Sequence, residues 1–315
     1  MSSTATKYGI DPKKLTQQHV RAALLSKTFQ RSFTKFFKYV QGPEYKYGRH
    51  TNGLLEAIEW AVERYRRGIS SYIVAEVMFR QGKSDVSSKT FPAWAKMAFP
   101  DDDVILACHG AELAGNFSAK CQRLVELHGG FFHVGPGDKF ARDRWELNEG
   151  KGEFASCGIR KGPTGLGAGF LIIDDPYNGR AQADSEADRA SAWDSFTGDL
   201  MTRLAPVHIV LVVNNRWGPQ DLVGRIRDKN NPEHDDYDPE FPVFKTVTFP
   251  AHNEDWKTPE NPEGWLFPER YSAAWYQAQR GAMGGENGYQ WRSQAMQDPV
   301  PRHGILWDVS KIEYV

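Results

Sequence analysis

The sequence predicts an α/β fold in which a mainly parallel sheet lies between helices. Three stretches, VILACHG at 104–110, GFLIIDD at 169–175 and HIVLVVNN at 208–215, contain runs that are apolar throughout instead of at alternate positions. Strands of that kind are covered on both faces, as they are in a parallel sheet. Stretches with helical periodicity separate them, and this alternation is how a chain builds a parallel sheet flanked by helices.

The first expected elements are helical. Four phenylalanines recur at helical spacing in KTFQRSFTKFFKYV, so we expect within residues 1–50 an amphipathic helix that packs on the core and has a basic face. Contact of that basic face with DNA or a partner is the alternative. A second helix is expected at 53–68, because Gly68 suits its C-terminal end. A third helix is expected to begin within 84–94, and Pro92 should end or kink it early.

The pattern changes after Pro250, where polar loops and helices replace the alternation of strands and helices. We therefore expect an N-terminal helical arm at 1–50, a core domain at 51–250 and a small appended lid or linker subdomain at 251–300. Besides the three apolar runs, the expected strands are 71–79, 130–135, 152–159 and 243–251, and the further helices are 111–129, 185–204, 220–229 and 272–283.

The composition excludes several classes of protein. The 39 basic and 40 acidic side chains give a formal net charge of -1, so contact with nucleic acid would need a local patch or several subunits. The three cysteines lack zinc-site spacing and are expected to be free thiols in a reducing compartment. No apolar run reaches the roughly 20 residues of a bilayer span, and the N-terminus lacks the apolar core of a signal peptide. We expect an intracellular protein.

A tripeptide typical of phosphate-binding loops, Gly82-Lys83-Ser84, follows an expected strand and precedes an expected helix. In that position, backbone N–H groups at the turn and at the helix N-terminus face the phosphates. Lys83 would reach the β- and γ-phosphates, and Ser84 would hold Mg²⁺. Val77 stands where the motif usually has its first glycine, and Arg80 adds a second cation. Because the tripeptide alone is common, its place between strand and helix carries the prediction.

Two carboxylates end the apolar run in FLIIDDP. Paired acids at the carboxyl end of a buried strand face the crevice in which α/β sheets bind ligands. Asp174 would hold the magnesium, directly or through water, and Asp175 would orient or deprotonate an attacking water. Alternatively, the pair begins a helix or a turn, since Asp before Pro is common there.

A polar pair ends the next apolar run, VLVVNNRW. An amide at Asn214 or Asn215 would sense the γ-phosphate or the attacking water, although asparagine is also a good turn residue. Arg216 and Trp217 are alternatively braces of the strand end. The lysine and serine, the carboxylates and the polar sensor together fit hydrolysis of a nucleoside triphosphate by a P-loop NTPase of the ASCE, RecA-like type.

Beyond these motifs, the chain resembles the ATPase part of a tailed-phage large terminase, the motor that packs DNA into the capsid. A phosphate loop that lacks the usual glycine and carries an extra arginine is frequent in that family. The stretches that carry the resemblance run in order from about residue 50 to residue 307: RQGKS with FPAW, HGAELAGNFSAK, TGLGAGFLIIDDP, AWDSFTGDLMTRLAP, VNNRW with QDLVGRI, and LFPERYSAAW with QDPVPRHGILW.

The resemblance implies an ATP- and Mg²⁺-dependent hydrolase that moves double-stranded DNA, working as a homo-oligomeric ring on the portal protein with a small terminase subunit, in the host cell cytoplasm. Asp175 would be the catalytic acid, where such motors usually have glutamate, and Asn214 and Asn215 fall at the coupling motif. Arg49 and His50 are candidates for the adenine side. The implied phosphate site comprises Arg80, Gln81, Gly82, Lys83 and Ser84, with Asp174 as the Mg²⁺ acid.

The chain departs from the family in two places. In TGLGA, Leu166 stands where the family has an arginine that can reach a neighbouring subunit's site. Arg160, Lys161 or Arg123 would substitute for it, and without such an arginine isolated subunits should hydrolyse ATP slowly. The family usually continues into a nuclease domain. Residues 301–315 would begin the linker to that domain, so we expect no nuclease activity from this chain.

Two other functions are consistent with these residues. A helicase or another P-loop nucleic-acid motor would respond to single strands, although TRLAP and QDPVPRHG weigh against it. A nucleotide-binding assembly module would bind ATP with negligible turnover. For DNA, the candidates Lys139, Arg142 and Arg144 lie in a stretch that is equally typical of a solvated charged loop. Residues expected to be structural are Trp256, Trp265, Trp275, Trp291, His128 and His133.

Overall fold

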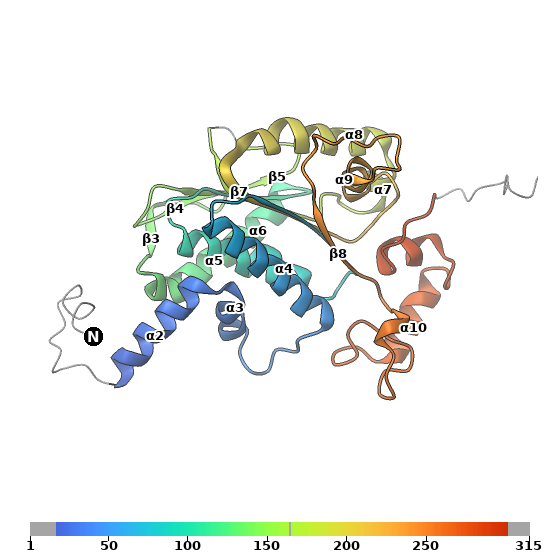
Figure 1. Ribbon diagram of the computed structural model, residues 1–315, viewed down its shortest axis with the longest axis horizontal. Helices are drawn as coiled ribbons and strands as arrows, with labels where there is room; N and C mark the ends of the chain where they lie inside the picture. The colour runs from blue at the N-terminus through green and yellow to red at the C-terminus, as the bar shows by residue number, and fades with distance from the viewer. Residues whose placement is uncertain (1–16, 164, 302–315) are drawn as a thin grey trace, which may run out of the picture.

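The computed structural model describes residues 17–163 and 165–301. The strands in these residues are β1 (Ser71–Val77), β2 (Val104–Cys108), β3 (Pro136–Phe140), β4 (Arg144–Leu147), β5 (Glu153–Gly158), β6 (Ala168–Asp174), β7 (Leu204–Asn214) and β8 (Lys245–Phe249). They form one sheet in the order β3-β4-β5-β2-β6-β7-β1-β8 (Figure 1). From β5 to β8 every neighbouring pair is parallel. The prediction of an α/β fold with a mainly parallel sheet is confirmed.

The two faces of the sheet carry separate hydrophobic cores beneath separate layers of helices (Figure 1). In β6, Phe170 and Ile172 belong to one core, whereas Leu171 and Ile173 belong to the other. None of the described helices is long and apolar enough to cross a membrane. The first core is covered by α3 (Phe33–Gln41), α4 (Arg49–Arg66), α5 (Phe91–Ala98) and α6 (Ala111–His128), and the second by α7 (Arg180–Asp184), α8 (Glu186–Asp194) and α9 (Leu222–Asn230).

The N-terminal region packs on the core as two helices instead of one. The chain forms α2 (Gln17–Arg31) and then α3, and Ser32 between them caps α3 by accepting a hydrogen bond from the N–H of Lys35 at 3.3 Å. Phe33, Phe36 and Phe37 are all 0% exposed. Their burial explains the spacing of the phenylalanines and confirms that this amphipathic region packs on the core.

Pro92 does not end the helix early, which was one of the two outcomes expected for it. It lies in the first turn of α5, where a residue does not need to donate a backbone hydrogen bond to the helix. A π-helix, η2 (Asp85–Thr90), precedes it, and the N–H of Phe91 donates to the carbonyl of Val86. Because this wider turn leads directly into α5, the helical path continues through the proline.

The prediction of a strand at 130–135 is also wrong. The segment forms a 3-10 helix, η3 (Gly129–Phe132), which ends at His133 with a left-handed φ of 61°. Its apolar residues fill the first core beside α2, and the carbonyl of Phe131 accepts hydrogen bonds from Ser26 and Gln30. A short apolar run alone does not distinguish a strand from a buried helical turn. Here the run forms the helical turn that packs against α2.

Residues 251–301 form a region with a small core of its own, drawn orange to red in Figure 1. Its elements are the 3-10 helix η6 (Glu254–Trp256), α10 (Ala273–Ala282) and the π-helix η7 (Trp291–Ala295). Trp265 stacks on Tyr276 with ring centroids 4.6 Å apart, and Trp291 is fully buried beside them. The core of this region also includes Met78, the residue that follows β1, so the region packs directly on the end of that strand.

Candidate active site

The segment that joins β1 to η2 contains the residues predicted to form the phosphate loop and has two unusual backbone angles. Gly82 has φ 80°, and Arg80, which is not glycine, has φ 59°. Such strain persists only where surrounding contacts hold it, and it is frequent at functional sites. Here the carbonyl of Arg80 accepts a 2.7 Å hydrogen bond from the Tyr271 hydroxyl. The carbonyl of Gln81 is 2.7 Å from Nε2 of His50, which therefore carries a proton.

His50 is buried against the backbone of this loop. It is 2% exposed, and its ring packs edge-on against Phe267 at 5.0 Å between centroids. Burial lowers the pKa of His50 to about 4, with the hydrogen bond to Gln81 acting in the opposite direction. The ring is therefore neutral at physiological pH. His50 thus contacts the backbone of the loop and does not line the groove next to it.

Lys83 and Asp175 form an ion pair at the centre of the site. Nζ of Lys83 lies 2.8 Å from Oδ1 and 2.9 Å from Oδ2 of Asp175. Burial alone would lower the pKa of Lys83, but the charges of Asp175 and Asp174 outweigh burial and raise it. Lys83 is therefore held as a cation although it is only 8% exposed.

Asp175 directly follows β6 and has a left-handed conformation with φ 46°. Its backbone N–H donates to the carbonyl of Val213 in β7, and its own carbonyl accepts from the N–H of His109 after β2. Both bonds are close to 3 Å long, at 3.1 and 3.0 Å. The ends of three neighbouring strands therefore fix the direction in which the carboxylate of Asp175 leaves the sheet.

Asp174 is completely buried beside this pair. Oδ2 accepts a 2.6 Å hydrogen bond from the Ser88 hydroxyl, while Oδ1 has no hydrogen-bond partner among the described residues. Burial, and then the charge of Asp175, raise the pKa of Asp174 to about 6, although Lys83 and the hydroxyls of Ser88 and Ser84 act to lower it. Ser88 was not predicted as a site residue, because its hydroxyl meets Asp174 only once η2 packs on β6.

The atoms around Asp174 fit a magnesium ion. Mg²⁺ prefers oxygen ligands, usually one or two from protein together with water and substrate phosphates. Oδ1 of Asp174 is a buried carboxylate oxygen without a partner, and the Ser84 hydroxyl also interacts with this carboxylate. Asp174 and Ser84 would therefore hold the ion.

The two asparagines at the end of β7 have different surroundings. Asn215 lines the groove with Lys83 and Asp175, whereas Asn214 is 0% exposed and pairs in register with Glu76 of β1. Neither amide atom of Asn214 has a hydrogen-bond partner among the described residues. Of the two predicted sensors, only Asn215 is placed to contact a ligand in the groove.

Arg216 braces the strand end, as one of the sequence interpretations proposed. It is 3% exposed, its Nε lies 3.0 Å from both carboxylate oxygens of Asp221, and its Nη1 lies 2.9 Å from Oε1 of Glu76. Its backbone N–H donates to Oε1 of Gln297 at 2.9 Å, which links β7 to the region 251–301. The two buried acids raise its pKa against the effect of burial.

Gln297 is a point at which this link can be tested. It is 3% exposed, and replacing it with alanine would leave the buried N–H of Arg216 without its acceptor. An unpaired buried donor costs about 1–3 kcal/mol, so we expect Gln297→Ala to lower the free energy of unfolding by about that amount in urea denaturation. Gln290→Ala, at an exposed position of the same region, should change it by less than about 0.5 kcal/mol. Equal losses for the two variants would show that the link does not stabilise the fold.

These residues surround one groove with a volume of about 530 Å³ at the carboxyl ends of β1, β6 and β7. The cations Arg80, Lys83, Lys89 and Arg270 line it, with the acids Asp85 and Asp175, which makes it suited to a polyphosphate. Sequence reasoning missed Lys89, Phe117, Arg270 and Tyr271. The last two lie in LFPERYSAAW, a stretch that carried the resemblance to the terminases, but no spacing rule connects it to the loop.

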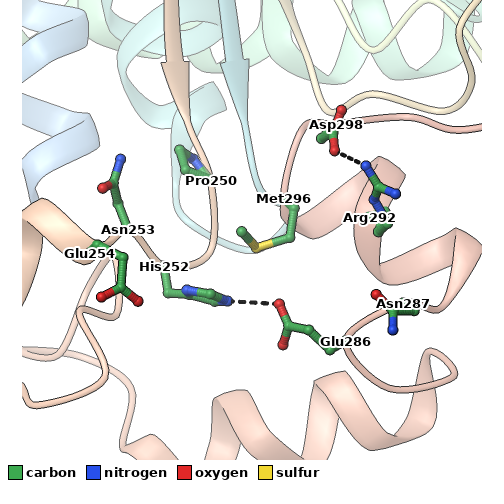
Figure 2. Close-up of a pocket in the computed structure, with 9 residues that line it drawn as sticks. All are labelled: Pro250, His252, Asn253, Glu254, Glu286, Asn287, Arg292, Met296 and Asp298. Atoms are coloured by element: carbon green, nitrogen blue, oxygen red, sulfur yellow. Dashed lines mark hydrogen bonds and ion pairs between the residues drawn. The ribbon is translucent and has the colours of Figure 1, made fainter.

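A second pocket, of about 400 Å³, is lined by Pro250 and by residues of the region 251–301 (Figure 2). Its charged side chains bind one another: His252 contacts Glu286 at 3.2 Å, and Arg292 forms an ion pair with Asp298. Glu254 pairs with Lys257. Both cations of this pocket are paired with acids, whereas Arg270 of the first groove forms no ion pair within the described residues, so the first groove is the better candidate for the active site.

Comparison with known proteins supports the fold. No family model and no curated protein matches the sequence. The structure matches the crystal structure of the HK97 bacteriophage large terminase with a TM-score of 0.52 and 14% sequence identity, over 82% of this chain and 52% of that protein. The chain has a large-terminase fold. It spans about half the length of the HK97 protein.

Two further solved structures are similar to the chain. A large terminase from a thermophilic bacteriophage aligns over 80% of this chain and 53% of its own length, with a TM-score of 0.47 and 14% identity. The large terminase ATPase domain of a Thermus phage aligns over 81% of this chain and 100% of its own length, with a TM-score of 0.47 and 16% identity.

The structure does not bring the three residues expected to replace the missing arginine to the groove. Arg160 pairs with Asp188 at 2.5 Å, and Arg123 pairs with Glu126 on the surface of α6 at 3.0 Å. Lys161 is exposed, and none of the three lines the groove. Leu166 is buried in the second core, and Thr164 of the same stretch lies outside the described residues, as do residues 302–315. Arg49 stacks over Trp256 at 6.0 Å.

The basic residues considered for DNA contact lie on an antiparallel extension of the sheet. Lys139 and Arg144 belong to β3 and β4, which extend the sheet at the edge beyond β5 and were not predicted as strands. Lys139 lies 3.8 Å from Glu146, Arg144 pairs with Glu153, and Arg142 donates to Asn116. Each of these cations therefore already has a partner within the chain.

Proposed function

We propose that the chain is the ATP-hydrolysing motor part of a viral large terminase, which moves double-stranded DNA into a procapsid. One observation carries the proposal: Lys83, Asp175 and Asn215, from the ends of three different strands, line one groove beside the buried acid Asp174. A cationic loop, two acids and a polar sensor are the groups that phosphoryl transfer to water requires. The large-terminase fold supports the assignment to a packaging motor.

Nucleotide binding would change the partners of Lys83. In the free chain its charge is neutralised by Asp175. A bound triphosphate would attract Lys83 and Arg80, and the backbone N–H groups at Gly82 and Ser84 would hold the phosphate oxygens. Release of Lys83 would leave the Asp175 carboxylate free to orient water and to accept its proton.

Two further groups would complete the reaction. Asn215, which follows the strand between β6 and β1, would position the water or the γ-phosphate. Magnesium, bound by Ser84 and Asp174 when present, would neutralise charge on the phosphate oxygens. The proposed partners are double-stranded DNA, a portal protein and a small terminase subunit, around which copies of the chain would form a ring.

Steady-state phosphate release from ATP and Mg²⁺, measured with and without DNA, tests this function. We expect turnover that duplex DNA stimulates more than single strands do, and that Lys83→Ala abolishes, since that variant removes the buried cation of the groove. Stimulation by single strands with unwinding of a duplex would favour a helicase. ATP binding without turnover, at every protein concentration and with duplex present, would instead favour a nucleotide-binding assembly module.

A further inference from the structure

Arg270 reaches the phosphate loop from a distant part of the chain. It lies in the region 251–301, and its side chain lines the groove together with Lys83 and Arg80. Its Nη1 atom is 3.9 Å from the point that a Cβ atom on Gly82 would occupy. The guanidinium group therefore lies next to the loop backbone at the residue that begins the Gly82-Lys83-Ser84 turn.

The charge of Arg270 is not neutralised within the described residues. No acid there forms an ion pair with it, whereas Lys83 is paired with Asp175 and Lys89 with Asp85. Arg270 is exposed, and it lies over the ring of Tyr271 at 5.4 Å. A planar guanidinium with free donors beside a phosphate loop is suited to bidentate contact with a phosphate group.

The turn that carries Arg270 is connected to the loop at two places. The N–H groups of Arg270 and Tyr271 both donate to the carbonyl of Phe267, which orders the turn. The Tyr271 hydroxyl donates to the carbonyl of Arg80. The ring of Phe267 packs on His50, which contacts the carbonyl of Gln81. The position of Arg270 is therefore tied to the conformation of the loop.

We propose that Arg270 binds the polyphosphate chain of the nucleotide from within the same subunit. This inference rests on the proposed function, because it adds a residue to the same site. Arg270 supplies a cation from the region 251–301, so that this region and the sheet bind one ligand together. Nucleotide binding then stabilises the docked position of that region on the sheet.

Calorimetric titration of the full chain with ATP, and separately with inorganic tripolyphosphate, tests the contact. A hydrogen bond between charged groups contributes about 1.5–3 kcal/mol, so Arg270→Ala should weaken binding of both ligands by about 10- to 100-fold. Arg270→Lys should recover part of the loss, because lysine keeps the charge without the bidentate fork. Arg292→Ala, in the same region but lining the pocket of Figure 2, is the matched control and should bind both ligands as the wild type does.

The outcomes separate this inference from the proposed function. If Lys83→Ala abolishes ATP binding and Arg270→Ala leaves it unchanged, the nucleotide site stands and the role of Arg270 is wrong. A loss for ATP without a loss for tripolyphosphate would place Arg270 on the base or ribose and overturn its phosphate contact. If Arg270→Lys binds both ligands as tightly as the wild type, the bidentate contact of the guanidinium is wrong. If the wild type binds neither ligand, both proposals are overturned.

Discussion

Replacing Asp175 with asparagine is expected to lower kcat for ATP hydrolysis by about 10²- to 10⁴-fold, the usual contribution of a general base. Asparagine retains the size of the side chain and tolerates the left-handed φ of 46° at this position. It cannot accept the proton of water, and it no longer holds Lys83 by charge. The dissociation constant for ATP should therefore stay the same or decrease while turnover falls. Single-turnover hydrolysis and equilibrium titration measure the two quantities separately.

Asp235→Asn is the matched control for this prediction, since Asp235 is an exposed carboxylate in the loop after α9. It should leave both kcat and the dissociation constant unchanged. Wild-type turnover in Asp175→Asn would show that another group positions and deprotonates the water. A parallel loss of ATP affinity would instead assign Asp175 to ground-state binding.

Replacing Arg216 with methionine should be among the most destabilising changes in the sheet. Methionine has a similar length but no charge, so Asp221, which is 0% exposed, would remain buried without its cation. Glu76, also 0% exposed, would keep only the half-exposed Arg227. Breaking a buried ion pair by removal of one partner costs about 3–5 kcal/mol. We expect the free energy of unfolding in urea to fall by about that amount.

Arg227→Met provides the comparison, because Arg227 contacts the same oxygen of Glu76 at 3.3 Å but its side chain is 50% exposed. Exposed pairs contribute about 0–1 kcal/mol, so the loss should be several times smaller than for Arg216. Similar losses for the two variants would mean that burial of the pair does not determine its contribution.

Local signals in the sequence predicted most of the sheet and the ends of its strands. The runs at 169–175 and 208–215 are apolar because both faces of β6 and β7 are covered. The apolar pattern therefore predicted the strands of a sheet that lies between two layers of helices. The same runs indicated Asp174, Asp175 and the asparagine pair, since parallel strands end at one edge of the sheet.

The remaining features depend on contacts between distant segments. Ser88 meets Asp174 across 86 positions, and Arg270 reaches a loop that is almost 190 positions away in the chain. The choice between Asn214 and Asn215 depends on where β7 ends, and helical periodicity or composition cannot decide it. The hairpin of β3 and β4 was missed because the exposed charged residues Asp138, Lys139 and Arg144 interrupt its apolar positions, which is also typical of a loop.

The left-handed backbone at Asp175 restricts how this position can diverge during evolution. Among residues other than glycine, aspartate and asparagine adopt such angles most readily, and most others cost about 1–2 kcal/mol there. Glutamate would retain the acid but would lose this backbone compatibility and extend the carboxylate by one methylene. Asparagine would retain the backbone and lose the acid. Aspartate satisfies both requirements, so a change to glutamate in this chain would need a compensating change in the backbone that follows β6.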